Sequence, residues 1–254
     1  MNALDGRSVL VTGAARGIGA AIAEAVVEEG GAVALLDIDS AGADTAARLA
    51  DRGAAHFFPC DVRSLDEVER AVSDAERALG GLDGLVNNAG VNAYFDAVAM
   101  TEDDWDSVFA VDLKAAWMLA KAALPGLIER RGALVNISSI QARLTLRGVF
   151  PYAAAKAGLE GLTRSLALDY APAGVRVNAV APGYTDTRLV QEWLDLQDDP
   201  AAALESVLAK IPLGRIAHPR EIGGAVVFLL SDQASAITGA TLAVDCGIGA
   251  RFAT

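Results

Sequence analysis

Short apolar segments alternate with longer amphipathic segments along the whole chain, and this alternation limits the possible folds more than any other feature. The apolar segments are mostly continuous, which is typical of parallel strands that are buried on both faces. Between them, apolar residues recur at the three- and four-residue spacing of helices. We therefore expect one α/β domain over residues 1–254, with helices on both faces of a doubly wound parallel sheet of about seven strands. The predicted strands are 8–12, 32–36, 55–59, 84–87, 133–137, 175–180 and 240–244, and the predicted helices begin near 18 and lie near 41–50, 65–79, 101–128, 152–170 and 219–230.

The charge of the chain argues against nucleic acid as a partner. Its 33 acidic and 21 basic residues give a formal net charge of −12, and no basic stripe interrupts this acidity. A surface of this sign repels a phosphate backbone. No apolar run approaches the roughly 20 residues that a membrane helix needs, and the N-terminus lacks the basic and apolar parts of a secretory signal. We expect neither a nucleic-acid nor a membrane partner.

The cysteines and histidines do not suggest a metal site. Cys60 and Cys246 are far apart in the sequence, and His56 and His218 each stand alone. Zinc sites need such residues in closely spaced sets. We expect a reduced, cytoplasmic protein that holds no metal.

A glycine-rich turn joins the first predicted strand to the first predicted helix, in the sequence Thr-Gly-Ala-Ala-Arg-Gly-Ile-Gly at 12–19. Such a turn lets the backbone approach a pyrophosphate, which the helix N-terminus then stabilises, although glycines also serve strand–helix packing. Asp37 ends the second strand, 18 residues after Gly19, where a carboxylate would accept hydrogen bonds from ribose hydroxyls. The same carboxylate would repel a 2′-phosphate, so NAD is favoured over NADP. Arg16 is the opposing signal, because a basic side chain in the glycine turn would pair with a 2′-phosphate. Asp61 follows the third strand, where it would either receive the adenine amino group or cap a helix.

Tyr152 and Lys156 are four residues apart and therefore share one face of a predicted helix. That face continues as an apolar stripe, and a buried lysine is costly unless it has a partner or a task. A nearby ammonium would favour the phenolate of a tyrosine, whose ordinary pKa is about 10, so the pair suits acid–base chemistry at a carbon–oxygen bond. Ser139 ends a strand 13 residues earlier and would hydrogen-bond the reacting oxygen.

With these motifs the chain resembles the short-chain dehydrogenase/reductase family over nearly its whole length. The turn at 12–19 matches the family's TGxxxGxG, residues 87–90 match its NNAG, and Tyr152 and Lys156 match its YxxxK. The resemblance implies a Rossmann-type fold and hydride transfer between NAD(P) and an alcohol or ketone. It also implies that Tyr152 is the acid/base, that Ser139 orients the substrate oxygen, and that Lys156 binds the ribose and lowers the tyrosine pKa. The implied cofactor contacts are Gly13, Arg16, Gly17, Ile18, Gly19, Asp37, Asp61, Val62, Asn88, Ala89, Gly90, Tyr152, Lys156, Pro182, Gly183, Thr185 and Thr187.

Two residues depart from the family's pattern. Asp112 stands where the family usually has the asparagine that anchors a proton-relay water. Asp112 either replaces that asparagine, if the backbone carbonyl holds the water, or changes the charge state of Lys156. Cys246 replaces a usual glycine, which we expect to affect packing rather than chemistry.

The segment between Ser139 and Tyr152 is expected to border the substrate pocket. Its Gln141, Arg143 and Arg147 would hydrogen-bond a polyhydroxylated or anionic compound, unless the arginines lie on the surface. Residues 183–213, which mix polar and aromatic side chains, are the predicted lid and suit a sugar, polyol or sugar acid better than a steroid. Further candidate substrate residues are Asn92, Tyr94 and Tyr184.

Three functions remain open on the sequence alone. The first is an NAD-dependent dehydrogenase of a sugar, polyol or hydroxy acid. The second is a 3-oxoacyl-carrier-protein reductase, against which Asp37 and the acidic charge argue, although Arg130 and Arg131 would form a basic patch. The third is a non-catalytic dinucleotide-binding protein, which only Asp112 favours. The resemblance further implies a homotetramer in which the helices near 101–128 and 152–170 pack between subunits.

Overall fold

A single parallel sheet forms the centre of the computed structural model, which describes residues 2–250. Within these residues the sheet has seven strands in the order β3-β2-β1-β4-β5-β6-β7, all paired in parallel. The doubly wound architecture expected from the sequence is confirmed. The strands are β1 (Ser8–Thr12), β2 (Ala32–Asp37), β3 (Ala55–Pro59), β4 (Gly84–Asn87), β5 (Ala133–Ile137), β6 (Arg176–Pro182) and β7 (Thr241–Val244).

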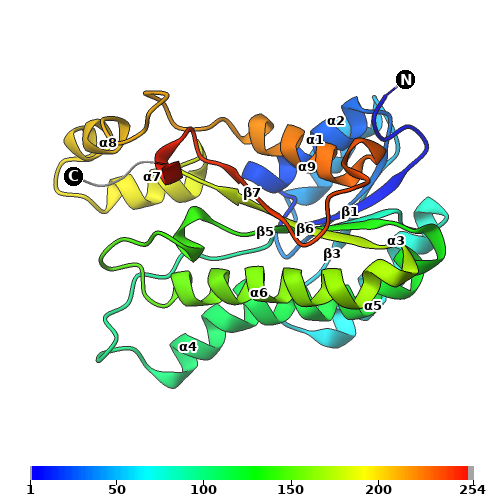
Figure 1. The fold of residues 1–254 in the computed structure, drawn as a ribbon, viewed down its shortest axis with the longest axis horizontal. Helices are drawn as coiled ribbons and strands as arrows, with labels where there is room; N and C mark the ends of the chain where they lie inside the picture. Colours follow the sequence, from blue (N-terminus) through cyan, green and yellow to red (C-terminus); the bar gives the residue numbers. More distant parts are fainter. Residues whose placement is uncertain (1, 251–254) are drawn as a thin grey trace.

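Helices cover both faces of the sheet (Figure 1). The α1 and α9 helices pack against each other on one face, together with α2, whereas α3, α5 and α6 cover the other. The α7 and α8 helices lie in the segment 183–213, beyond the carboxyl end of β6. The helices are α1 (Gly17–Glu28), α2 (Gly42–Ala50), α3 (Leu65–Leu79), α4 (Glu102–Phe109), α5 (Ala115–Arg130), α6 (Tyr152–Tyr170), α7 (Arg188–Asp195), α8 (Pro200–Leu208) and α9 (Pro219–Leu230).

The strands are continuously apolar because each of their faces has its own core. Val9 and Val11 pack into the core beneath α1 and α9, while Leu10 between them packs into the core beneath α3 and α5. In β2, Leu35 and Leu36 are divided between the two cores in the same way. Successive side chains of a strand point to opposite faces, so a sheet that is covered twice needs apolar residues at every position.

The strand order reverses at β1, which pairs with β2 on one side and β4 on the other. The chain therefore leaves these neighbouring strands in opposite directions, and a crevice opens at their carboxyl ends, where ligands bind in such sheets. The loops that follow β1, β2, β4, β5 and β6 all begin at this edge.

The predicted helix at 101–128 differs from the observed structure. A π-helical turn, Ala110–Lys114, separates α4 from α5, so the segment is not one regular helix. Such turns insert one residue into the helical repeat and are frequent at functional sites. Asp112 lies at the middle of this turn.

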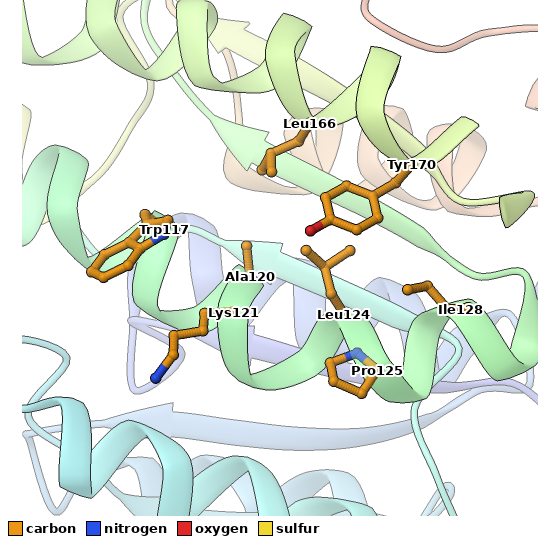
Figure 2. Close-up of a pocket in the computed structure, with 8 residues that line it drawn as sticks. All are labelled: Trp117, Ala120, Lys121, Leu124, Pro125, Ile128, Leu166 and Tyr170. Carbon is orange, nitrogen blue, oxygen red and sulfur yellow. The ribbon is translucent and has the colours of Figure 1, made fainter. Parts of the chain in front are cut away.

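Two surface findings complete the fold. A groove of about 260 Å³ runs along α5 and α6 and is lined mainly by apolar side chains of both helices (Figure 2). No helix within residues 2–250 is both long and apolar enough to cross a membrane.

Candidate active site

A cavity of about 1240 Å³ lies at the carboxyl edge of the sheet. It extends from the end of β2, past the ends of β1, β4 and β5, to the segment that holds α7 and α8. The cavity brings together 16 of the 17 expected cofactor residues, five of the six expected substrate residues, and Ser139, Tyr152 and Lys156.

The glycine turn is shaped for close approach by a ligand. Gly13 and Gly17 have φ of +62° and +59°, a conformation that L side chains rarely adopt. A Cβ at Gly13 would also lie 2.9 Å from Ala89 Cα, and a Cβ at Gly19 would lie 2.1 Å from Gly13 O. Gly19 is therefore buried beneath the turn, where it lets α1 pack closely, rather than in the cavity lining.

The N-terminus of α1 is open towards the cavity. Gly17 and Ile18 line the cavity, and among the described residues no side chain caps the first turn of α1. In contrast, Ser64 caps α3 and Thr101 caps α4. Free N–H groups beside glycines form a cradle for an anion, and this fits the pyrophosphate of a dinucleotide.

Hydrogen bonds fix the carboxylate of Asp37 at the end of β2. Its two oxygens accept from the backbone N–H of Ala15 and of Asp39, each at 2.9 Å. Beside it, Arg16 forms an ion pair with Asp39. Arg16 is therefore already neutralised, so its opposition to Asp37 in the choice of cofactor is weakened.

Asp61, which lines the cavity just after β3, is held in a similar way. Both of its carboxylate oxygens accept from the Arg63 guanidinium, at 2.7 to 3.0 Å. These hydrogen bonds lower the pKa of Asp61, despite its partial burial.

The NNAG segment connects the glycine turn to the catalytic end. Asn88 donates from its amide to the carbonyl oxygens of Thr12 and Gly13, at 2.9 and 3.1 Å. Thr12 Oγ1 in turn accepts from the N–H of Asn88 and of Ala89. Asn87 donates from its amide to Asn136 Oδ1 at 2.8 Å, inside the sheet. These bonds hold the ends of β1, β4 and β5 in fixed relative positions.

Tyr152 begins α6, and Lys156 lies one turn later. The Lys156 ammonium is 5.4 Å from the centre of the Tyr152 ring and donates to Ile137 O at 3.3 Å. It also forms an ion pair with Asp112, at 3.2 Å. Ser139 lies two residues after the end of β5, accepts from Gln141 N at 3.1 Å, and lowers the pKa of Tyr152.

Asp112, Lys156 and Tyr152 are close enough for their charges to shift the pKa values of Tyr152 and Lys156. Burial raises the pKa of Tyr152; Lys156 lowers it and Asp112 raises it further. Burial by itself would lower the pKa of Lys156, but Tyr152 and Asp112 outweigh burial and keep it above the ordinary value. The lysine is therefore an ammonium, and it opposes the effect of burial on Tyr152.

Other residues lie where the sequence motifs did not place them. Arg143 lines the cavity, but Arg147, four residues later, is exposed and lies outside its lining. Asp112 lies behind Lys156 rather than in the cavity wall. Sequence reasoning missed several lining residues of both ends of the cavity. Among them are Asp39 and Arg63, each two residues after an expected contact, and Leu146 and Lys210, which lie in segments that were expected to border the substrate but were not named individually. For Ile248 the sequence carried no signal.

Comparison with known proteins agrees with this geometry. Residues 13–249 match a family model described as "Enoyl-(Acyl carrier protein) reductase". The chain is 40% identical to 2-(S)-hydroxypropyl-CoM dehydrogenase 3 of Xanthobacter autotrophicus, over 98% of this chain and 99% of that one. It is 38% identical to a 3-oxoacyl-[acyl-carrier-protein] reductase of Vibrio harveyi, over 96% of this chain and 98% of that one.

A solved structure shows the same fold. The ligand-free aldohexose dehydrogenase of Thermoplasma acidophilum matches with a TM-score of 0.92 and 35% identity, over 100% of this chain and 98% of that one. Together with the parallel sheet and the matched motifs, these likenesses show that the chain is an oxidoreductase of the short-chain dehydrogenase/reductase family.

Proposed function

We propose that this protein is an NAD-dependent dehydrogenase that oxidises a secondary alcohol of a sugar, polyol or sugar acid, or reduces the matching ketone. The observation that carries the proposal is the position of Ser139, Tyr152 and Lys156 in the same cavity as the glycine turn and Asp37. Acid–base groups beside a dinucleotide cradle suit hydride transfer at a carbon–oxygen bond.

The roles of the side chains follow from their contacts. Tyr152 accepts the alcohol proton during oxidation and returns it during reduction, and the Lys156 ammonium stabilises its phenolate. Ser139, which lines the cavity with Tyr152 and lowers its pKa, positions the substrate oxygen. Pro182, Gly183, Thr185 and Thr187 form the far wall, which would hold the nicotinamide. When bound, the dinucleotide supplies the hydride acceptor or donor.

The preference for NAD rests on the two carboxylates at the end of β2. Asp37 lies where the ribose hydroxyls would bind, and Asp39 engages Arg16, a cation that lines the cavity beside it. A 2′-phosphate would therefore meet negative charge without a free guanidinium to balance it.

The substrate wall contains one buried hydrogen-bond acceptor that has no partner among the residues that the structure describes. Gln141 Oε1 is buried and has no hydrogen-bond partner within residues 2–250, although Gln141 lines the cavity. A buried acceptor without a partner costs free energy, which a substrate hydroxyl would recover. On the lid, the rings of Tyr184 and Trp193 lie with centroids 5.9 Å apart and planes tilted by 47°, and each ring offers an aromatic face to the apolar side of a sugar. The name of the aldohexose dehydrogenase relative supports the same substrate class.

Reduction of a 3-oxoacyl group on a carrier protein is the second candidate, favoured by the likeness to the Vibrio harveyi enzyme. The expected basic patch does not support it. Arg130 and Arg131 lie at the C-terminal end of α5, directly before β5 begins, so they are at the edge of the sheet opposite the cavity. Arg130 is also engaged by Asp83 and by Gly80 O.

We further propose that the protein is a homotetramer in the cytoplasm, with α5 and α6 packed between subunits. The groove in Figure 2 supports this contact, because Trp117 and Ile128 on its walls are 46% and 37% exposed. Cys60 and Cys246 are both free thiols, as in proteins of reducing compartments. Sedimentation of the wild type and of Trp117→Asp tests the contact: dissociation of the variant supports it, and a monomeric wild type contradicts it.

The decisive experiment follows the absorbance of reduced nicotinamide. NAD⁺ and NADP⁺ are each mixed with sugars, polyols, hydroxy acids and sugar acids, and NADH and NADPH with a 3-oxoacyl thioester. Reduction of NAD⁺ by one sugar class supports the proposal. Activity only with NADPH and the thioester would favour the second candidate, and NAD binding without any turnover would favour a non-catalytic binding protein.

A further inference from the structure

Asp112 forms a buried ion pair directly behind the catalytic tyrosine and lysine. The side chains of Asp112 and Lys156 are 0% and 4% exposed, and their charged atoms are 3.2 Å apart. Lys156 in turn lies beside the Tyr152 ring. The three ionisable groups therefore form one row, from the cavity into the protein interior.

The surrounding backbone is arranged to hold the carboxylate in this place. Asp112 lies in the π-helical turn between α4 and α5, against which α6 packs. Its Oδ1 atom accepts from Val91 N at 3.2 Å, in addition to facing Lys156. A Cβ at position 90 would lie 2.8 Å from this oxygen and 3.3 Å from Lys156 Nζ, so Gly90 leaves the space that the pair occupies.

Only one oxygen of the Asp112 carboxylate, Oδ1, has a partner among residues 2–250. Asp112 Oδ2 is buried and has no hydrogen-bond partner in the described part of the chain. A carboxylate that served packing alone would be expected to have both oxygens satisfied. The contact that compensates its burial is the one with Lys156.

The charge of Asp112 reaches Tyr152 through Lys156. An uncharged side chain at this position would leave the ammonium free to stabilise the phenolate, whereas a carboxylate balances that ammonium. The other ionisable groups nearby do not substitute for it. Burial raises the pKa of Tyr94 to about 12, so it is neutral near pH 7. Glu160, one turn after Lys156 on α6, is engaged by Arg143 at 3.0 Å.

We propose that Asp112 is a positioning residue that balances the charge of Lys156 and thereby sets the pH at which Tyr152 releases its proton. With the carboxylate present, Tyr152 stays protonated to higher pH than it would beside a neutral side chain. Alcohol oxidation, which needs the phenolate, then requires more alkaline conditions, while ketone reduction, which needs the phenol, continues to higher pH.

A titration of the free protein tests this without any substrate. The ultraviolet absorbance of phenolate is followed against pH in the wild type and in Asp112→Asn, each with and without Tyr152→Phe. The difference within each pair isolates Tyr152 from the other three tyrosines of the chain. We expect the midpoint for Tyr152 to fall by on the order of one pH unit in Asp112→Asn. Equal midpoints in the two proteins would overturn the proposal.

A kinetic experiment, which rests on the proposed function, distinguishes an effect of Asp112 on the Tyr152 pKa from an effect on the stability of the fold. The acidic limb of the kcat profile for oxidation is expected to move to lower pH in Asp112→Asn by the same amount as the spectroscopic midpoint. Asp106→Asn, an exposed carboxylate on α4, makes the same change in net charge and is expected to move neither. If Asp112→Asn and Asp112→Ser lower the melting temperature but leave the midpoint and the limb in place, the role of Asp112 is structural.

Discussion

The ion pair between Arg16 and Asp39 offers a sharp test of cofactor choice. Asp39→Asn keeps the size of the side chain and an oxygen that can accept from Ala41 N, as Asp39 does at 2.9 Å. It removes the charge that holds Arg16, which is then free to pair with a 2′-phosphate. Asp37→Asn instead removes a carboxylate that would repel this phosphate.

The expected size of each effect follows from Coulomb's law. Two unit charges about 4 Å apart interact by about 1 kcal/mol in bulk water and by about 4 kcal/mol near a protein surface. The side chains of Arg16 and Asp39 are 47% and 38% exposed, so screening by solvent favours the lower value. Because about 1.4 kcal/mol corresponds to a factor of ten, a change of about 1 kcal/mol is expected to raise the NADP-to-NAD ratio of kcat/KM about fivefold for each substitution. The double variant is expected to gain roughly thirtyfold if the two effects add.

The assay measures kcat/KM for both dinucleotides at saturating alcohol, at low and high salt. Adding Arg16→Gln to Asp39→Asn is the control, because it removes the cation that the first substitution frees. We expect this second change to cancel the gain, and high salt to reduce it. An unchanged ratio in Asp39→Asn, or a gain that survives the loss of Arg16, would refute the argument.

Three further substitutions test other parts of the site. Tyr152→Phe is expected to abolish turnover while NAD binding, followed by fluorescence titration, stays within about threefold of the wild type; retained turnover would remove Tyr152 from its role. Gln141→Leu is expected to raise KM for the substrate about threefold to tenfold with little change in kcat, the value of one hydrogen bond, and an unchanged KM would place the substrate elsewhere. Gly19→Ala is expected to destabilise the fold by about 1–3 kcal/mol in urea denaturation, because its Cβ would overlap Gly13 O. Gly224→Ala, on α9 with no described atom within 4 Å of the new Cβ, is the matched control and should be neutral or slightly stabilising.

Sequence patterns predicted most of the fold, because a sheet that is buried on both faces needs strands that are apolar at every position, and such strands are easy to recognise in the sequence. Leu10 and its neighbours are all apolar, because successive side chains of the strand pack alternately into the two cores on the two faces of the sheet. The ends of β1, β3, β4 and β5 were predicted as observed, because polar residues and glycines begin where the cover of the helices ends. The division of the 101–128 segment was not predicted. A π-helical turn keeps helical backbone angles and helix-forming residues, so no breaker marks it in the sequence.

The candidate site could be predicted where a motif fixes both the residue and its backbone. Tyr152, Lys156 and the glycine turn are of this kind, since each lies at a strand end or on the first turns of a helix. Arg143 and Arg147 could not be distinguished, because they lie in the irregular segment before α6, where side-chain direction follows no period. The pairing of Arg16 with Asp39 depends on two loops that meet only in the folded chain.

The hydrogen bonds of Asn88 to the glycine turn have a consequence for how such an enzyme can acquire new activities. The bonds of Asn88 join the ends of β1 and β4, and the ion pair of Asp112 with Lys156 joins the π-helical turn to α6; neither set involves the segment before α6 or the α7 and α8 helices. The part of the molecule that performs the chemistry is thus mechanically separate from the part that selects what is oxidised. Residues 188–213, which follow Thr185 and Thr187 of the cavity wall and hold α7 and α8, are expected to tolerate exchange or lengthening with less effect on the reaction than on the choice of substrate. One domain therefore contains two separable parts. Substitutions and insertions in the loops that border the substrate are expected to change which substrate binds, while the positions of the catalytic side chains stay the same.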